Sequence, residues 1–320
     1  MKQDIIPLNG LPAAGLTGAY NDYISFLDAT PRTIQTYTGN IKQFIKWTHE
    51  HGIQKPTRQD IIAYREELKG RCKPTTVQNY ITALRLFFAW TAQAGIYPNI
   101  ADHIKGAKLN AEHKKDYLNA SQVQDILSSI DTETARGKRD YCIIALMVTG
   151  GLRDIEVSRA NIEDLKTLGD STVLYLQGKG REERTDYIKV VPAVEKPLRE
   201  YLKTRQNVKG QQPLFTSLSN NSKGQRLTPR SISSIVKDRL IQAGYNSDRL
   251  TAHSLRHSAV TISLIGGLPL EEVQQFARHK NISTTQIYAH NLERAKNRSE
   301  DTIAASIFSK SGRKGANAWK

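Results

Sequence analysis

Cysteine and long apolar runs are scarce in this sequence, and each absence excludes a class of protein. The two cysteines, Cys72 and Cys142, lie far apart and match no metal-ligand spacing, so neither a disulfide framework nor a zinc module is expected. The N-terminus lacks the charged start and apolar run of a signal peptide, and the longest apolar stretch, "YCIIALMV", is too short to cross a bilayer. We therefore expect a soluble protein of the cytoplasm, with no membrane partner.

Acidic residues are also in deficit. The chain has 31 Asp and Glu against 46 Lys and Arg, a formal net charge of +15, and the basic residues recur along its whole length. This distribution favours an extended polyanion as partner, with nucleic acid ahead of a membrane surface. With 320 residues, 38% of them apolar, the chain is long enough for two domains with separate cores.

The first part of the chain, residues 17–105, has a helical pattern throughout. Apolar residues recur at helical spacing, for example at Val77, Ile81, Leu84, Phe87 and Phe88. Start signals divide the pattern: "TPRT" precedes the second predicted helix, "PTRQD" the third and "KPTT" the fourth. The sequence therefore predicts a small four-helix bundle.

A basic stretch without periodicity, residues 106–117, predicts an exposed linker between this bundle and a second domain over residues 118–308. In that domain "SQVQDIL" has a capping-box pattern at Ser121 and Gln124, and "RDYCIIALMVTG" is typical of a buried central helix. The runs "STVLYLQ" and "RTDYIKVV", joined by "GKGREE", predict a hairpin, with "NIEDLK" as a third strand. The second domain is predicted to be mainly α with one small antiparallel three-stranded sheet. The basic tail, residues 309–320, is expected to be disordered.

Two polar clusters in this domain could carry chemistry. In "TGGLRDIEVSRANIEDL", Arg153 and Glu156 share a helix face; the pair is either a surface ion pair or the start of a phosphate clamp held rigid by the preceding buried helix. In "GKGREER", Lys179 lies between two glycines at the predicted hairpin tip. It is either an ordinary loop lysine or one that reaches a DNA groove or a leaving oxygen.

The third cluster, "TAHSLRHS", places His253, Arg256 and His257 on one face of a helix. The histidine spacing matches a zinc HExxH motif, but Ser254 replaces the glutamate that acts as general base there. His257 is predicted to be a buried core residue, whereas His253 is favoured as functional because of the neighbouring arginine. In the fourth, "HKNISTTQIYAHN", Tyr288 follows His279 by nine residues. Alone, Tyr288 would be interpreted as a helix-surface residue.

The order of these clusters within one basic chain resembles the tyrosine recombinase (phage integrase) family. The resemblance extends over residues 17–300 and includes "TPRTIQTYTGNIKQFIKW" and "LRLFFAWTAQAGI" in the N-terminal segment. It implies a SAM-like core-DNA-binding bundle followed by a catalytic domain. About sixteen residues precede the first predicted helix, so the resemblance is to an Xer-like layout without an arm-binding domain.

The resemblance also implies a role for each matching residue. Arg153 and Arg256 would grip the scissile phosphate, Lys179 would protonate the departing 5′ oxygen, and Tyr288 would be the nucleophile. His253 and His279 would assist proton transfer, with Glu156 and His257 in support. Ala277 and Arg278 depart from the leucine and glycine that often precede the family's histidine, and Arg278 adds charge near the phosphate.

The implied chemistry needs no metal and no cofactor. Two permanently charged guanidinium groups match the negative charge that develops on the phosphate oxygens. A tyrosine with a pKa of about 10 is a poor nucleophile at neutral pH, so it needs a cationic pocket and a proton acceptor. The covalent 3′-phosphotyrosyl bond would conserve the energy of the DNA linkage, so that strands could be rejoined through a Holliday junction without ATP.

Double-stranded DNA is the expected partner, held between the two domains. Candidate phosphate contacts are Arg32, Lys42, Lys46, Lys73, Arg85, Lys105, Lys108, Arg230 and Lys237. Family members act as tetramers on two duplexes, so the segment "NLERAKNRSEDTIAASIF" would dock on a neighbouring protomer through Ile303, Ile307 and Phe308, or else on its own domain. Accessory DNA-binding proteins could join such an assembly.

Two alternatives to a recombinase remain open at this point. A type IB topoisomerase shares the arginine, lysine, histidine and tyrosine chemistry but relaxes supercoils as a monomer; the compact bundle and the "HSLRH…ARH…IYAH" order favour a recombinase. A DNA-binding protein that had lost activity would be free to lose Tyr288. For a recombinase, the sequence is compatible with integration, excision or chromosome-dimer resolution.

Overall fold

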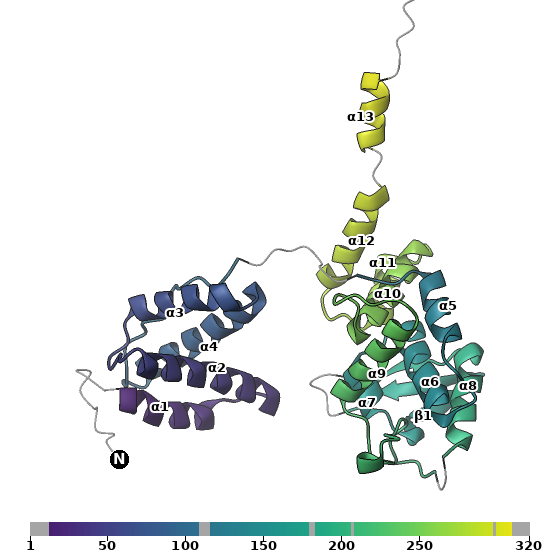
Figure 1. Cartoon of the computed structure of the whole chain (residues 1–320), viewed down its shortest axis with the longest axis horizontal. Helices are drawn as coiled ribbons and strands as arrows, with labels where there is room; N and C mark the ends of the chain where they lie inside the picture. The colour runs from purple at the N-terminus through teal and green to yellow at the C-terminus, as the bar shows by residue number, and fades with distance from the viewer. Residues whose placement is uncertain (1–12, 109–115, 179–182, 206–207, 297–298, 309–320) are drawn as a thin grey trace, which may run out of the picture. The chain divides into compact units, whose positions relative to one another are not determined.

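The computed structural model describes residues 13–108, 116–178, 183–205, 208–296 and 299–308. The chain forms two compact units that divide between residues 112 and 113, here the N-terminal unit and the C-terminal unit (Figure 1). The tail predicted to be disordered, residues 309–320, lies outside the described residues.

The N-terminal unit is helical, as the sequence predicted. Its helices are α1 (Ala13–Phe26), α2 (Pro31–Glu50), α3 (Arg58–Arg71) and α4 (Pro74–Gln93). Thr30 caps α2 by accepting a hydrogen bond from the Thr33 amide, and Pro31 follows at the first helical position, where its fixed φ suits a helix start. The first helix begins at Ala13, earlier than the Thr17 at which the pattern starts.

The core of the N-terminal unit is aromatic. The Tyr23 and Phe87 rings meet edge to face at 5.3 Å between centroids, and Phe44 and Tyr64 do so at 5.2 Å. Edge-to-face geometry places the positive rim of one ring on the negative face of the other, which adds to the stabilisation from burial. At the border of this core the Trp47 indole N–H donates to Glu67 Oε2 at 2.5 Å.

The C-terminal unit contains the remaining described helices. They are α5 (Ala120–Ser128), α6 (Ala135–Thr149), α7 (Asp154–Arg159), α8 (Pro192–Lys203), α9 (Pro229–Gln242), α10 (Ala252–Ile265), α11 (Leu270–Ala277), α12 (Ser283–Lys296) and α13 (Ser299–Phe308). The capping box of α5 was predicted wrongly at Ser121 and Gln124. Asn119 and Gln122 form it, because the Asn119 side chain accepts from the Gln122 amide while Gln122 Oε1 accepts from the Asn119 amide.

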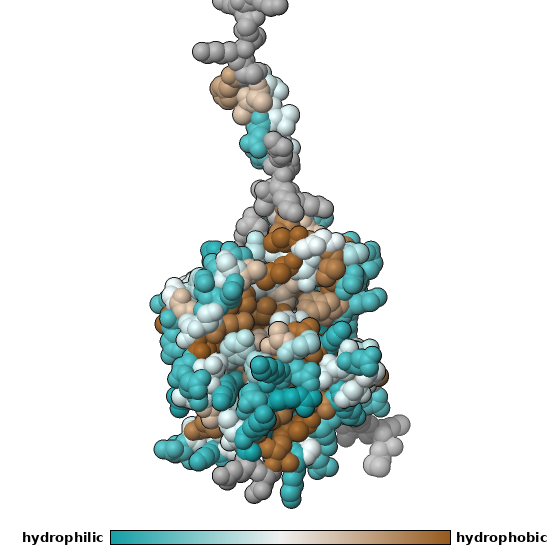
Figure 2. Space-filling view, turned by 90° about the vertical axis from the view of Figure 1, so that its right-hand side faces the viewer, coloured by the Kyte–Doolittle hydropathy of each residue, from teal (hydrophilic) through white to brown (hydrophobic). Residues whose placement is uncertain are grey.

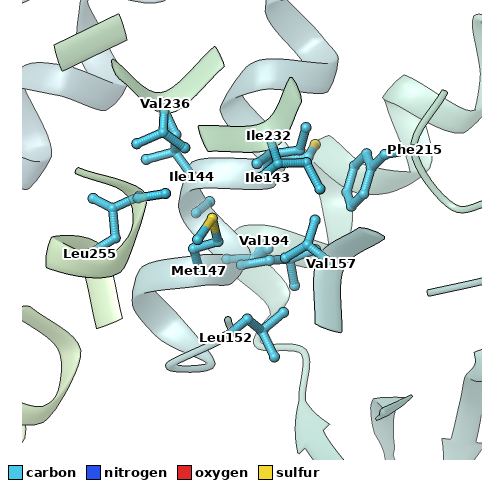
Figure 3. Close-up of a cluster of buried hydrophobic side chains, with 14 of the residues drawn as sticks. Ile143, Ile144, Met147, Leu152, Val157, Val194, Phe215, Ile232, Val236 and Leu255 are labelled. Carbon is cyan, nitrogen blue, oxygen red and sulfur yellow. The ribbon is translucent and has the colours of Figure 1, made fainter. Parts of the chain in front are cut away.

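Helix α6 is the central element of this unit, as its apolar sequence predicted. Its Ile143, Ile144 and Met147 side chains meet residues from α7, α8, α9 and α10 in one aliphatic cluster (Figure 3). Every side chain from Cys142 to Met147 is buried, since neighbours cover the helix on nearly all sides. Despite this apolar helix, the described parts of the chain include no helix that is both long and apolar enough to span a membrane.

The small sheet has the antiparallel order β1-β2-β3, which confirms the predicted class. The strands are β1 (Leu165–Leu168), β2 (Ser171–Leu176) and β3 (Asp186–Lys189). The third predicted strand, "NIEDLK", is only partly a strand: Ile162–Asp164 form a 3₁₀ turn that Asp164 closes by accepting from the Asn161 amide at 2.7 Å, and β1 starts afterwards. The tip of the β2–β3 hairpin, residues 179–182, lies outside the described residues.

The first buried residue of the C-terminal unit, Leu118, is tied directly to α10. Its backbone N–H donates to the Ser258 hydroxyl at 2.7 Å, and the Leu118 side chain is part of the aliphatic core. Ser258 in turn donates to the carbonyl of Ser254 within α10. The chain therefore enters this unit at the helix that contains the histidine and arginine cluster.

Candidate active site

The turn after α6 places Arg153 at the start of α7. Gly150 and Gly151 end α6, and Gly151 has a left-handed φ of +58°; a Cβ there would meet the Phe276 ring of α11 at 3.2 Å, so glycine is favoured on both counts. Glu156 closes a capping box with Arg153: one carboxylate oxygen accepts from the Arg153 amide at 2.8 Å and the other from its guanidinium at 2.7 Å. The turn thus fixes both ends of Arg153.

Glu156 distinguishes this pair from a surface ion pair. Its side chain is 1% exposed, whereas that of Arg153 is 29% exposed. Burial alone would raise the pKa of the Glu156 carboxyl, but the charges of Arg278 and Arg153 outweigh burial and the pKa is lowered. A buried, ionised carboxylate therefore holds a guanidinium that still reaches solvent.

The second arginine, Arg256, projects from α10 and is buried. Its guanidinium donates to the carbonyl of Gly151 at 2.5 Å and to the carbonyl of Ala277 at the end of α11. Burial, then the charges of Arg153 and Arg278, lower the pKa of Arg256 to about 9, so the group stays charged at neutral pH. Arg256 thereby links the turn after α6 to the end of α11.

Tyr288, on α12, packs against the apolar side chains of Val260, Val273 and Ala277. Its phenol oxygen shares a hydrogen bond with Nδ1 of His257, which is buried as the sequence predicted. Burial raises the pKa of Tyr288 to about 12, although Arg256 acts in the opposite direction. The phenol is therefore protonated at neutral pH in this structure.

Of the two other histidines, His253 contacts His257 and His279 lies beside Tyr288. His253 is exposed, and its ring meets that of His257 edge to face at 4.5 Å between centroids. The His279 ring lies nearly parallel to that of Tyr288 at 6.4 Å, and its Nδ1 is 2.9 Å from the hydroxyl of the fully buried Thr285. Burial, then the charges of Arg256, Arg153 and Arg278, lower the pKa of His279 to about 4, so it is neutral at pH 7.

Two further residues belong to this site: Thr285, which was not predicted from the sequence, and Arg278. Thr285 orients His279, and its only signal was a polar run between that histidine and Tyr288. Arg278 was noted as a departure from the family pattern; its guanidinium lies 3.2 Å from Glu156 with the side chain 10% exposed. The structure therefore brings a third arginine to the turn that holds Arg153.

A cavity of about 440 Å³ opens beside these groups. Its lining includes Arg153, His279 and Gly178, the last described residue before the hairpin tip. Lys179, the predicted general acid, lies outside the described residues. The end of β2 therefore reaches the same cavity as the arginine and the histidine.

The candidate DNA contacts remain predictions. The seven in the N-terminal unit are all exposed: Arg32, Lys42, Lys46, Lys73, Arg85, Lys105 and Lys108. In the C-terminal unit Arg230 is exposed, but the Lys237 ammonium donates to the carbonyl of Ser247 at 2.6 Å and so holds the loop before α10.

The comparisons with known proteins agree with this fold and site. Residues 116–294 match the model of the phage integrase family, and residues 16–96 match that of the phage integrase N-terminal SAM-like domain. The first match alone covers more than half of the chain, so the protein belongs to the phage integrase family, the tyrosine recombinases.

Curated relatives carry the names of Xer recombinases. Tyrosine recombinase XerC of Caldanaerobacter subterraneus subsp. tengcongensis is 33% identical over 61% of this chain and 52% of its own length. Tyrosine recombinase XerD of Staphylococcus haemolyticus is 32% identical over 55% of this chain and 58% of its own. The chain thus spans between half and three fifths of the length of these relatives.

Solved structures show the same fold at low identity. XerH site-specific recombinase bound to palindromic difH substrate superposes with a TM-score of 0.69 and 23% identity, over 87% of this chain and 80% of that one. Tn1549 transposon integrase in complex with circular intermediate DNA gives 0.67 and 16% identity, over 87% and 94%. These likenesses confirm the predicted fold class.

Proposed function

We propose that this protein is a site-specific DNA recombinase, acting in the cytoplasm, in which Tyr288 is the nucleophile. The observation that carries the proposal is the grouping of one phenol with histidines and arginines in the C-terminal unit: Tyr288 is bonded to His257, its ring lies parallel to that of His279, and His279 lines the same cavity as Arg153. Burial, then the charges of Arg256 and Arg153, lower the pKa of His279, as expected for a histidine close to both cations. Cations placed close together suit a negatively charged group such as a phosphodiester. Double-stranded DNA supplies phosphodiesters and also fits the net charge of +15.

The proposed reaction exchanges one phosphoester bond for another. The Tyr288 oxygen bonds to phosphorus, the bond from phosphorus to the 5′ oxygen breaks, and the phenol proton passes to a histidine. Lys179 gives a proton to the departing 5′ oxygen, a step worth roughly two to four orders of magnitude in rate. Arg153 and Arg256 hold the nonbridging oxygens, where charge develops in the transition state.

Rejoining reverses these steps with a different strand. The 5′ hydroxyl of a partner strand attacks the phosphotyrosyl bond and Tyr288 leaves, so no external energy source is consumed. Exchange of one pair of strands gives a Holliday junction, and exchange of the second pair completes recombination. Integration, excision and dimer resolution can all result from this one series of strand exchanges.

We propose that this structure represents the resting state of the active site. The phenol is buried, is hydrogen-bonded to His257 and has a pKa of about 12, so at pH 7 very little phenolate is present. A phosphate placed between Arg153 and Arg256 would stabilise the transition state but would not by itself ionise the phenol. We propose that DNA binding also frees the Tyr288 hydroxyl from His257.

We further propose that the active assembly is a homotetramer on two duplexes, linked through α13. No residue of this helix is buried, and Ile303, Ile307 and Phe308 are 57%, 65% and 78% exposed. Figure 2 shows apolar side chains on this helix and also on the face of the C-terminal unit below it. Ile307→Asp should abolish the four-subunit complex on DNA in light scattering while leaving single-site binding intact; an intact tetramer would contradict the proposal.

The recombinase is tested by trapping the covalent intermediate. A duplex selected for binding from a randomised library is nicked near each candidate cleavage position, so that the released fragment diffuses away and the adduct accumulates. We expect a DNA-linked band on a denaturing gel with the wild type and none with Tyr288→Phe. The matched control is Tyr245→Phe, which removes a surface tyrosine hydroxyl that donates to Asp125. This variant should behave like the wild type.

A topoisomerase predicts a different result with intact DNA. Supercoiled plasmid without the selected site should remain supercoiled, and plasmid carrying two sites should yield recombinant products. Relaxation of both plasmids to the same extent, without recombinants, would assign the protein to the type IB class. Adduct formation by Tyr288→Phe would contradict the nucleophile assignment in either class.

A further inference from the structure

Arg278 has a backbone conformation that its side chain does not favour. It ends α11 with φ +53° and ψ +43°, in the left-handed region. Glycine is the usual residue at this position of a helix end, because a residue with a Cβ is strained there. The strain indicates that the Arg278 side chain makes compensating interactions.

The guanidinium of Arg278 makes those interactions across the site. It donates to the carbonyl of Gly151 at 2.9 Å, to that of Gly150 at 3.2 Å and to that of Phe276 at 2.9 Å. It also pairs with Glu156 Oε2 at 3.2 Å. One planar group thus joins the end of α11 to both glycines of the turn and to the carboxylate that holds Arg153.

The same carboxylate oxygen accepts from the backbone of Arg153. Glu156 Oε2 lies 2.8 Å from the Arg153 amide, and Oε1 lies 2.7 Å from its guanidinium. Arg278 therefore limits where Glu156 can move, and Glu156 limits where Arg153 can move. Arg278 is also the residue before His279, so one side chain connects the positions of the arginine and the histidine.

The terminal nitrogens of Arg278 are committed to bonds within the protein, whereas its buried Nε has no hydrogen-bond partner among the described residues. Its two terminal nitrogens are occupied by carbonyls and by Glu156, and the side chain is 10% exposed against 29% for Arg153. Arg153 has the more accessible guanidinium of the two. Both arginines line the cavity, but Arg153 is the more exposed of the two and Arg278 is the one whose terminal nitrogens are bonded to the turn.

We infer that Arg278 is a positioning residue for strand cleavage: it braces the Gly150–Gly151 turn and Glu156, and so fixes Arg153 and His279 for the phosphate. The inference rests on the proposed recombinase function. Because misplacement by about 1 Å can cost roughly 100-fold in rate, loss of the brace should slow cleavage without weakening DNA binding. Among the described arginines, Arg278 is the one whose guanidinium contacts both Glu156 and the carbonyls of Gly150 and Gly151.

Replacement by glycine gives a sharp test, because glycine favours the left-handed backbone while removing the guanidinium. Arg278→Gly should remain folded by circular dichroism and bind the selected duplex with unchanged Kd and unchanged salt dependence. Adduct formation at saturating DNA should fall roughly 10- to 100-fold. Arg278→Lys, which keeps the charge but not the fork of donors, should recover only part of the rate.

Two further measurements separate the possible outcomes. Arg278→Asn tolerates the same backbone and guards against a folding defect specific to glycine. Arg199→Gln, a surface arginine on α8, controls for the loss of one positive charge and should cleave at the wild-type rate. The Arg153 amide should exchange its hydrogen faster in Arg278→Gly than in the wild type, because its acceptor Glu156 is released.

A folded Arg278→Gly variant that cleaves at the wild-type rate would overturn the inference. So would weaker DNA binding with a salt slope reduced by about one, because that pattern identifies a phosphate contact. If the wild type forms no adduct, the proposed function fails, and the amide exchange of Arg153 still decides whether Arg278 braces the turn.

Discussion

The two units bury different kinds of side chain. In the N-terminal unit the buried polar residues among those described are threonines, Thr38, Thr48 and Thr91, and each donates its hydroxyl to a carbonyl of its own helix. The C-terminal unit buries charged groups instead: Arg139, Asp140, Glu156, Asp164 and Arg256. The N-terminal interior is filled by aromatic and aliphatic side chains, whereas the C-terminal interior also encloses ions.

This difference separates two ways of using a folded core. A buried threonine bonded within its helix adds little net energy and constrains nothing distant. A buried ion is stable only when its partners are in place, so Glu156 and Arg256 tie together segments far apart in sequence. The C-terminal unit thereby accepts a cost in stability for a rigid arrangement of charges around Tyr288, and the N-terminal unit presents basic residues on its surface.

The largest effect on stability is expected from Asp140→Asn. Asp140 lies between two arginines, accepting from Arg139 at 2.7 Å and from Arg239 at 2.6 Å, and it is 4% exposed. Removal of its charge leaves both cations without their counterion, so the free energy of unfolding should fall by about 3 to 5 kcal/mol. Urea unfolding followed by circular dichroism measures the change.

The matched control for Asp140→Asn lies in the other unit. Glu66→Gln breaks contacts with Arg65 and Lys69, but Glu66 is 52% exposed and water replaces its partners. Its unfolding curve should coincide with that of the wild type. Equal losses in the two variants would show that the contrast between the two interiors has no energetic meaning.

A smaller loss, about 2 to 3 kcal/mol, is expected for Glu156→Gln. The effect is smaller because Arg153 is partly exposed, so water can replace its partner, and because the buried Arg278 keeps its bonds to backbone carbonyls. Since the pKa of Glu156 is lowered from its ordinary 4.5, its contribution to stability is present above 4.5 and is lost as pH falls through the lowered pKa. Below pH 4.5 the variant should therefore lose less stability than the wild type, as urea titrations at several pH values will measure.

His279 predicts a separate pH window. Its pKa is lowered from 6.5 to about 4, so between these values the unfolded chain binds a proton that the folded chain does not. Stability should therefore decline as pH falls from 6.5 to 4, and His279→Gln should make this decline shallower. A ring titration by NMR with a midpoint near 6.5 would contradict the geometry of the cationic cluster.

The smallest effect is expected in the N-terminal unit. Trp47→Phe removes the hydrogen bond to Glu67, which is 41% exposed and can bond to water instead. The loss should be about 1 to 2 kcal/mol, mostly from the space the smaller ring leaves. Trp90 stays in place as the fluorescent probe. A loss as large as that of Asp140→Asn would mean that the aromatic core is no more tolerant than the charged one.

The parts of the fold that depend on nearby residues could be predicted from the sequence. Thr30 and Pro31 start α2 through a local hydrogen bond and a fixed φ, and the apolar run from Cys142 to Met147 identified the central helix. Asn119 was missed because two overlapping patterns, at Asn119 and at Ser121, both satisfy the capping rule. The helix start that forms depends on the packing of α5, which no local pattern records.

The candidate site was predictable in its members and not in its contacts. The order of Arg153, Arg256, His279 and Tyr288 follows the family pattern. The bond between Tyr288 and His257 joins residues 31 positions apart, and that between Arg278 and Gly150 joins residues 128 apart. Such contacts arise only when α6, α10, α11 and α12 assemble, so the bracing role of Arg278 could not be read from its place in a motif.

The bond between Leu118 and Ser258 has a mechanical consequence. Leu118 is among the first described residues of the C-terminal unit, and its backbone amide donates to Ser258 of α10 at 2.7 Å. Any displacement of Leu118 is therefore passed directly to α10 at Ser258, two residues from Arg256 and next to His257. One rigid helix thus connects the start of this unit with the hydrogen-bond partner of Tyr288, so the anchor and the phenol cannot be displaced independently.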